Sequence, residues 1–315
     1  MKNMHFRFVV IVCALAVVAG VGFFAARDSR GQSQKRNSLA QVQSPQRGSQ
    51  LKPAVLLKSA PVRSDAATSP MFSEAAAQNA LLRNDLTWSF GSKQQHGWYL
   101  YDLLIGQTLN LAPDASTGDF AGAIAVWQRQ KGINANGILD EKSLLALISQ
   151  WQSNRLKDKT PATSDQLLTA PPADIYDPQR LAELRQVEQR TYAAYKRMLA
   201  AAIADPELKL AHTSADELAP AEKFFKIVSA FRSREYQEHL RQQSPSAGSA
   251  GLAINSPHFT GRALDLYVGG DPVDTKDRNR AIQVNTAAYQ WLVHNAARFG
   301  FRPYFYEPWH WEYVG

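Results

Sequence analysis

The chain has 315 residues, of which 45% are hydrophobic and 20% are charged, and this composition is typical of globular proteins rather than disordered or fibrous ones. Such a length leaves room for two modest domains with flanking segments. The formal net charge of +7 comes from residues 1–70, where ten basic residues face two acidic ones, so residues 71–315 are nearly neutral and no nucleic-acid partner is expected.

The N-terminal 27 residues contain one long apolar stretch, Phe8 to Ala26, with 19 uncharged residues. A secretory signal usually has 7–15 apolar residues, whereas about 20 are needed to span a bilayer. The stretch also lacks a convincing cleavage site of small residues, so residues 1–27 are predicted to form an uncleaved membrane anchor, with a cleaved signal as the alternative. More basic residues follow the stretch than precede it, which by itself favours a cytoplasmic location for the rest of the chain.

Residues 28–70 are rich in Ser, Gln, Ala, Pro and basic residues and show no periodicity. This composition predicts a disordered basic linker. Its charge suits an anionic membrane surface or anionic wall polymers, and a merely solvated tether is the alternative.

Residues 71–152 are predicted to form a small helical domain. Ala123, Val126 and Trp127 recur at helical spacing, a turn follows at residues 134–137, and Asp140 is placed to cap the next helix. The Trp127-Gln128 pair and the Asn136-Gly137-Ile138 turn resemble the peptidoglycan-binding domain of many wall enzymes. An ordinary helical adaptor is the alternative.

Residues 153–176 are polar and proline-containing, which predicts a second linker. In residues 177–315 helices and short strands alternate. The predicted helices cover residues 178–204, 234–243 and 285–299, and the predicted strands cover residues 226–231, 263–268 and 309–314. The expected fold is therefore α+β, with a small helical domain followed by a mixed α+β domain that contains a short antiparallel sheet.

Two of the seven histidines lie in dense polar and aromatic clusters, and these are the candidates for chemistry. His258 precedes a strand in which Asp265 alternates with apolar residues, and a carboxylate in such a strand is costly unless it is paired or bound to metal. His310 lies in the second cluster, between Glu307 and Glu312. Two histidines and one carboxylate, with a fourth position left for water, form a common catalytic zinc arrangement.

At these residues the chain resembles the VanY- and VanX-type zinc peptidases, which cleave D-alanyl-D-alanine and related wall peptides. The family pattern S-x-H-x-x-G-x-A-x-D runs here from Ser256 to Asp265, and E-x-W-H runs from Glu307 to His310. The preceding S-x-[YF]-R-S segment is Ser229 to Ser233. The three motifs occur in the family's order, and the resemblance extends from about Leu181 to Val314.

The resemblance assigns a role to each matching position. It implies His258, Asp265 and His310 as ligands of Zn²⁺, Glu307 as the general base, Arg232 as the residue facing the substrate carbonyl, and Ser256 and Gln237 as residues near the substrate. Two alternatives remain open. Strand alternation places Glu312 on the same face as His310, so Glu312 competes for the role of base, and Arg232 could instead be a structural ion-pair partner.

The expected function is a zinc-dependent D-alanyl-D-alanine carboxypeptidase acting on peptidoglycan stem peptides. A peptidoglycan endopeptidase with the same zinc chemistry is one alternative, and a non-catalytic wall-binding protein is another. The expected location is the cell envelope, anchored in the inner or cytoplasmic membrane through Phe8–Ala26, with the catalytic domain outside the cytoplasm because its substrate lies there.

Overall fold

The structure is a computed structural model that describes residues 70–91, 93–243 and 255–315. The predicted anchor and the basic linker therefore lie outside the described residues. Within the described ranges, no helix combines the length and the apolar character needed to cross a bilayer.

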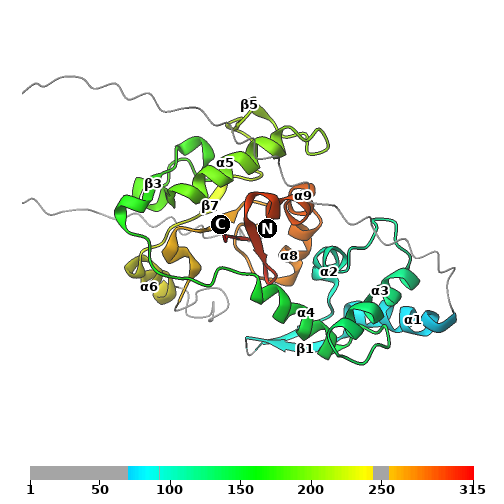
Figure 1. Ribbon diagram of the computed structural model, residues 1–315. Helices are drawn as coiled ribbons and strands as arrows, with labels where there is room; N and C mark the ends of the chain where they lie inside the picture. The colour runs from blue at the N-terminus through cyan, green and yellow to red at the C-terminus, as the bar shows by residue number, and fades with distance from the viewer. Residues whose placement is uncertain (1–69, 92, 244–254) are drawn as a thin grey trace, which may run out of the picture. The chain divides into compact units, whose positions relative to one another are not determined.

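The helices and strands follow one another along the chain as Figure 1 shows by colour. The helices are α1 (Pro70–Asp85), α2 (Asp102–Thr108), α3 (Thr117–Gln130), α4 (Glu141–Ser153), α5 (Gln189–Ile203), α6 (Arg234–Gln243), α8 (Asp277–Val284) and α9 (Ala287–Asn295). The strands are β1 (Thr87–Phe90), β2 (Lys93–His96), β3 (Leu167–Thr169), β4 (Gln186–Glu188), β5 (His212–Ser214), β6 (Glu217–Leu218), β7 (Ile227–Ser229), β8 (Ala263–Leu266), β9 (Phe301–Tyr304) and β10 (Glu307–Tyr313).

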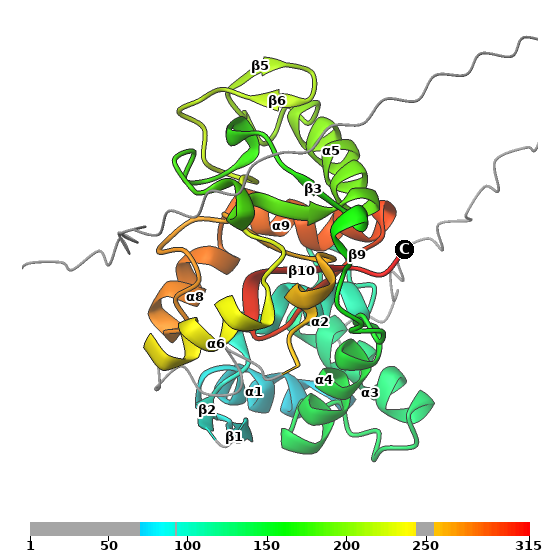
Figure 2. The ribbon, with the colours of Figure 1, turned by 90° about the vertical axis from the view of Figure 1, so that its left-hand side faces the viewer.

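A four-stranded antiparallel sheet, in the order β7-β8-β10-β9, forms the centre of the C-terminal region. Helix α8 packs against β10 (Figures 1 and 2). On β8 and β10, the apolar residues Leu264, Leu266 and Trp311 are buried in the main hydrophobic core. This arrangement confirms the predicted α+β class, and the predicted strands coincide with β7, β8 and β10.

The helix–turn–helix pattern of the N-terminal region is present as α3 and α4. Gln128 is buried and holds the turn between them, since its side chain accepts from the Gly137 amide at 2.9 Å and donates to the Ile138 carbonyl at 2.9 Å. Asp140 caps α4 by accepting from the Ser143 amide. The predicted apolar stripe is wrong at Val126, which is 51% exposed because α3 turns Ile124 and Trp127 toward the core.

The predicted helix over residues 178–204 is wrong in its first half, because α5 begins only at Gln189. Residues 182–185 form a short 3₁₀ helix instead, and β4 pairs with β3 of the segment that was predicted to be a linker. Glu188 then caps α5, with its carboxylate accepting from the Thr191 amide at 2.7 Å. The apolar periodicity of residues 178–188 predicts a helix, but the pairing of β4 with β3 determines their structure instead.

One hydrophobic core extends from the helical region into the α+β region. The rings of Tyr101 and Trp151 from the helical region contact the ring of Phe305, which lies between β9 and β10, in tilted arrangements. Arg280 of α8 is buried and donates to Tyr101 and to Gln95. The division into a domain over residues 71–152, a linker over 153–176 and a domain over 177–315 stays a prediction from the sequence.

Candidate metal centre

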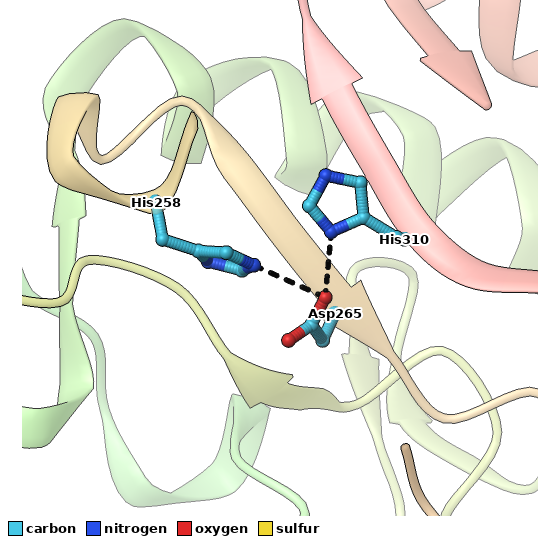
Figure 3. Close-up of side chains that lie close together, drawn as sticks. All are labelled: His258, Asp265 and His310. Atoms are coloured by element: carbon cyan, nitrogen blue, oxygen red, sulfur yellow. Dashed lines mark hydrogen bonds and ion pairs between the residues drawn. The ribbon is translucent and has the colours of Figure 1, made fainter. Parts of the chain in front are cut away.

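Three side chains of different elements converge at one buried point of the sheet. Asp265 and His310 are directly opposite each other in the β8–β10 pairing, which places both side chains on the same face. His258 comes from a short 3₁₀ helix, Pro257–Thr260, that precedes β8. Figure 3 shows both imidazole rings directed at the Asp265 carboxylate. His310 Nδ1 lies 2.9 Å and His258 Nε2 lies 3.3 Å from Asp265 Oδ1.

The short turn between His258 and Asp265 depends on Gly261. This residue has a φ of +65°, a backbone conformation that residues with a Cβ rarely adopt. A Cβ added there would also lie 2.9 Å from the backbone nitrogen of Glu188. The glycine of the sequence motif therefore permits the tight return that brings His258 back over β8.

In each imidazole ring one nitrogen is hydrogen-bonded to the protein on the side away from Asp265, and the other nitrogen is left for a metal. His258 Nδ1 lies 2.6 Å from the Ala230 carbonyl oxygen, which can only accept, so Nδ1 carries the proton and the Nε2 lone pair faces Asp265. His310 Nε2 lies 3.2 Å from Glu312 Oε1, which leaves Nδ1 on the side of Asp265. Hydrogen bonds of this kind from the second ring nitrogen are typical of metal-ligating histidines.

Burial and neighbouring charges set the protonation of the three groups. Burial and then Arg232 lower the pKa of His258 to about 4, so this ring is neutral near pH 7 and can bind a metal. Burial would raise the pKa of Asp265, but His258 and Arg232 hold it well below its ordinary value. Burial would lower the pKa of His310, but hydrogen bonds to Asp265 and Glu312 raise it to about 9. The two carboxylates thus favour a positive charge at this point.

The donor set fits a zinc ion. The three ligand atoms lie within 4.8 Å of one another, and all three residues are buried. Two imidazole nitrogens and one carboxylate oxygen, with the second nitrogen of each ring hydrogen-bonded, are the donors expected of a three-ligand zinc site with an open position, and a bound cation would take the place of the proton that the carboxylates favour on His310.

Arg232 lies beside the candidate ligands and is held from three sides. Its NH2 group donates to Asp265 Oδ2 at 2.6 Å, its Nε donates to Ser229 Oγ at 2.9 Å, and its NH1 group donates to Gln237 Oε1 at 3.4 Å. The structural ion pair that was an alternative for Arg232 is therefore present. Gln237 of α6 is buried and contacts Arg232.

Ser256 occupies the start of the turn that carries His258. It is buried, and its hydroxyl accepts from the His258 amide at 3.3 Å. The structure thus places Ser256 as a cap of the 3₁₀ helix, directly before the first candidate ligand.

The two candidate bases occupy different positions. Simple alternation along β10 would turn Glu307 away from His310, but the pairing of β10 with β9 is irregular between Glu307 and Trp311. Glu307 Oε2 consequently lies 4.0 Å from His310 Nδ1, on the side of the candidate metal. Burial raises the pKa of Glu307 to about 7.

Glu312 lies on the opposite side of the His310 ring and is fully buried. Its Oε1 contacts His310 Nε2 and the guanidinium of Arg155, and its Oε2 accepts from the Leu156 amide at 2.9 Å. Burial would raise the pKa of Glu312, but His310 and Arg155 lower it to about 2. Both of its oxygens therefore have fixed partners.

Arg155 was not predicted from the sequence. It is a single basic residue in a polar segment that was predicted to be a linker, and no motif surrounds it. Only the three-dimensional path of this segment brings it to Glu312.

Comparisons with known proteins agree with the motifs of the C-terminal region. Residues 184–315 match the family model of VanY: D-alanyl-D-alanine carboxypeptidase. This match confirms the resemblance inferred from the three motifs. Among solved structures, the chain is similar to a mutant of the vancomycin-resistance D,D-pentapeptidase VanY from a VanB-type resistance cassette in complex with Zn(II). The identity is 20%, the TM-score is 0.30, and the match covers 52% of this chain and 89% of that chain. None of the curated proteins matches.

Proposed function

We propose that this chain, whose residues 184–315 match the VanY family, is a zinc-dependent carboxypeptidase that removes the terminal D-Ala of peptidoglycan stem peptides. The observation that carries the proposal is the buried convergence of His258 Nε2, Asp265 Oδ1 and His310 Nδ1. The family match supports the carboxypeptidase type of reaction, and the donor set supports zinc.

Zinc held by these three residues would supply a Lewis acid that lowers the pKa of water toward about 7 and polarises a peptide carbonyl. Glu307 is the proposed general base. It lies 4.0 Å from His310 Nδ1, near enough for a reacting water to lie between Glu307 and the ligands. Its carboxylate accepts the proton of that water and then passes it to the departing amine, so that water adds to the carbonyl carbon as the C–N bond breaks.

Arg232 has two proposed duties. Its ion pair with Asp265 fixes the orientation of the carboxylate toward the histidines. A guanidinium has five N–H donors, and the contacts with Ser229, Gln237 and Asp265 use one from each nitrogen. A remaining N–H group can donate to the substrate carbonyl oxygen as negative charge develops there.

Ser256 and Gln237 act on the substrate site through their neighbours in this proposal. Ser256 holds the turn of His258, and Gln237 holds the guanidinium of Arg232. Both are buried beside the groups that would meet the substrate.

The proposed location is the outer side of the cytoplasmic membrane, because the stem peptides of the wall lie there. The anchor Phe8–Ala26 is the proposed attachment. Protease treatment of intact spheroplasts that make the full chain should degrade residues 71–315, and protection of these residues would contradict this location.

The function is tested by incubating the purified protein and zinc with a stem pentapeptide and, separately, with intact sacculi. Mass spectrometry should show loss of one D-Ala from the pentapeptide. An unchanged pentapeptide together with solubilised sacculi would replace the carboxypeptidase by an endopeptidase. No cleavage of either substrate, with tight sedimentation of the protein on sacculi, would favour a wall-binding protein.

A further inference from the structure

The outer shell of the candidate metal centre contains a residue from the segment that directly follows α4. Arg155 Nε donates to Glu312 Oε1 at 3.1 Å, and its NH2 group makes a second contact with the same oxygen. The next residue, Leu156, donates its amide to the other oxygen of Glu312. Glu312 is fully buried, so these two residues supply a charged partner and a backbone donor where water cannot.

Arg155 also reaches His310 by a second route. Its guanidinium lies over the ring of Tyr304, 3.9 Å from the centroid, and the Tyr304 ring contacts the His310 ring edge-on at a centroid distance of 5.9 Å. Gln152 of α4 accepts from the Arg155 NH1 group at 3.0 Å. Thus the last turn of α4 orients the guanidinium, which in turn contacts two neighbours of one candidate ligand.

The same segment continues to the other half of the centre. Figure 2 shows it, in green, leading from α4 to β3. The Ala162 amide donates to the Phe259 carbonyl at 2.8 Å, directly after His258, and Lys159 Nζ donates to the Asn255 carbonyl at 3.2 Å. The connecting segment, defined as residues 154–162, therefore contacts the flanks of both histidines, although it lies outside the residues that match the family.

We infer that Arg155 is a positioning residue for the metal site: it holds Glu312 so that Glu312 fixes the His310 ring with Nδ1 directed at the metal. This inference rests on the proposed function for its zinc ion. Without Arg155, Glu312 would lose the side chain that holds its Oε1 in place, and the carboxylate could turn away from His310. That rotation removes the hydrogen bond that orients His310. Loss of an outer-shell partner of this kind typically weakens metal binding by about 10- to 100-fold.

The test measures zinc affinity of the full chain by competition with a chromophoric chelator, without substrate. Arg155→Ala should raise the Kd for zinc roughly 10-fold or more, and Arg155→Lys, which keeps the charge but loses the fork of donors, should recover part of the loss. The matched control is Arg83→Ala. Arg83 forms an ion pair of 2.5 Å with Asp102 in the helical region and makes no described contact with the metal centre, so its loss should leave the Kd within about 2-fold.

A double-mutant cycle shows whether Arg155 acts through Glu312. Glu312→Gln should weaken zinc binding, and adding Arg155→Ala to it should cause little further loss, because the partner of Arg155 is already altered. Zinc affinity of Arg155→Ala equal to wild type, or effects that multiply in the double variant, would overturn the inference.

Two features keep the test decisive. If Arg155→Ala fails to fold by circular dichroism, Arg155→Lys is compared with Arg83→Lys, and equal zinc affinities of that pair would overturn the inference. Because zinc affinity is measured without substrate, an inactive wild-type protein would contradict the proposed function and leave the role of Arg155 to be decided by the same titration.

Discussion

Two glutamates five positions apart on β10 have opposite electrostatic environments. Burial raises the pKa of Glu307 to about 7, where a carboxylate can both take up and release a proton near neutral pH. Glu312 is also buried, but His310 and Arg155 lower its pKa to about 2 and keep it ionised. The environment of each carboxylate thus suits a different proposed role, proton transfer for Glu307 and orientation of His310 for Glu312.

Replacing Glu307 by Gln keeps the shape of the side chain and removes its capacity to accept a proton. We expect kcat to fall by roughly 10²- to 10⁴-fold while zinc stays bound, because Glu307 is not one of the three candidate ligands. The measurements are release of D-Ala from a stem pentapeptide and zinc content by mass spectrometry. Activity at the wild-type level would rule out Glu307 as the base.

Glu312 should make the metal-free protein sensitive to acid. Its ordinary pKa of 4.5 is lowered to about 2 in the folded protein, so between these values the unfolded chain takes up a proton that the folded chain does not. The stabilisation is complete above about pH 4.5 and is lost as the pH falls toward 2.

In the presence of a chelator, Glu312→Gln should therefore show a smaller decline of its unfolding free energy with falling pH than wild type. Denaturant titrations between pH 6 and pH 3 check this. Identical slopes for the two proteins would contradict the assignment of the low pKa to Glu312.

The turn formed by residues 257–261 is the element that places His258, and its weakest point is Gly261. Gly261→Ala would force a Cβ onto a φ of +65° and against Glu188 and Leu167. We expect a loss of about 1 to 3 kcal/mol in the free energy of unfolding, together with weaker zinc binding. Denaturant unfolding and chelator competition measure the two effects.

Gly106→Ala is the matched control for this turn. Gly106 lies inside α2 at an ordinary φ, and a Cβ there meets nothing within 4 Å, so the substitution should leave stability unchanged or slightly improved. Equal losses of stability and zinc affinity in the two variants would show that strain in the turn is not the cause of the effect of Gly261→Ala.

Elements with strong local signals were predictable from the sequence, whereas those determined by distant pairing were not. Strands β7 and β8 follow apolar patterns bounded by clear breaks, helix α6 covers the residues 234–243 that were predicted to be helical, and Asp140 caps α4 as its sequence predicts. The first half of the predicted helix 178–204 failed because β4 pairs with β3, a contact between segments that local periodicity does not describe. The convergence of His258, Asp265 and His310 was predictable because each lies in a dense motif.

The position of Glu307 near His310 could not be predicted from strand alternation, because it depends on the irregular pairing of β10 with β9. The contact of Arg155 with Glu312 could not be predicted either, because it depends on the path of the connecting segment and a single arginine gives no indication of that path. In both cases the missing information is tertiary.

Helices α2, α3, α4, α5 and α9 and the central sheet share one hydrophobic core, and buried contacts such as Arg280 with Tyr101 connect the helical region to the sheet region. A metal bound between β8 and β10 should therefore stabilise the helical region as well as the sheet. The connecting segment adds a polar link between α4 and the metal centre.

Removing zinc should lower the melting temperature of residues 70–315 in a single transition. A thousandfold excess of zinc over its Kd stabilises the folded state by about 4 kcal/mol, and this stabilisation is lost in chelator. Differential scanning calorimetry with zinc and with chelator, combined with hydrogen exchange on α4, checks the prediction. Two separate transitions, of which only one responds to zinc, would show that the helical region folds independently of the metal centre.

The cross-strand pairing of Asp265 with His310 has a consequence for recognising distant relatives of this chain. Two candidate ligands that pair across a sheet can be separated by connections of very different length, and here the connection between their strands contains α8, α9 and β9. His258 and Asp265 are joined instead by a single tight turn, in which one inserted residue would move every later side chain of β8 to the opposite face. A sequence pattern used to search for relatives should therefore keep the exact number of residues between His258 and Asp265 and allow any number between Asp265 and His310.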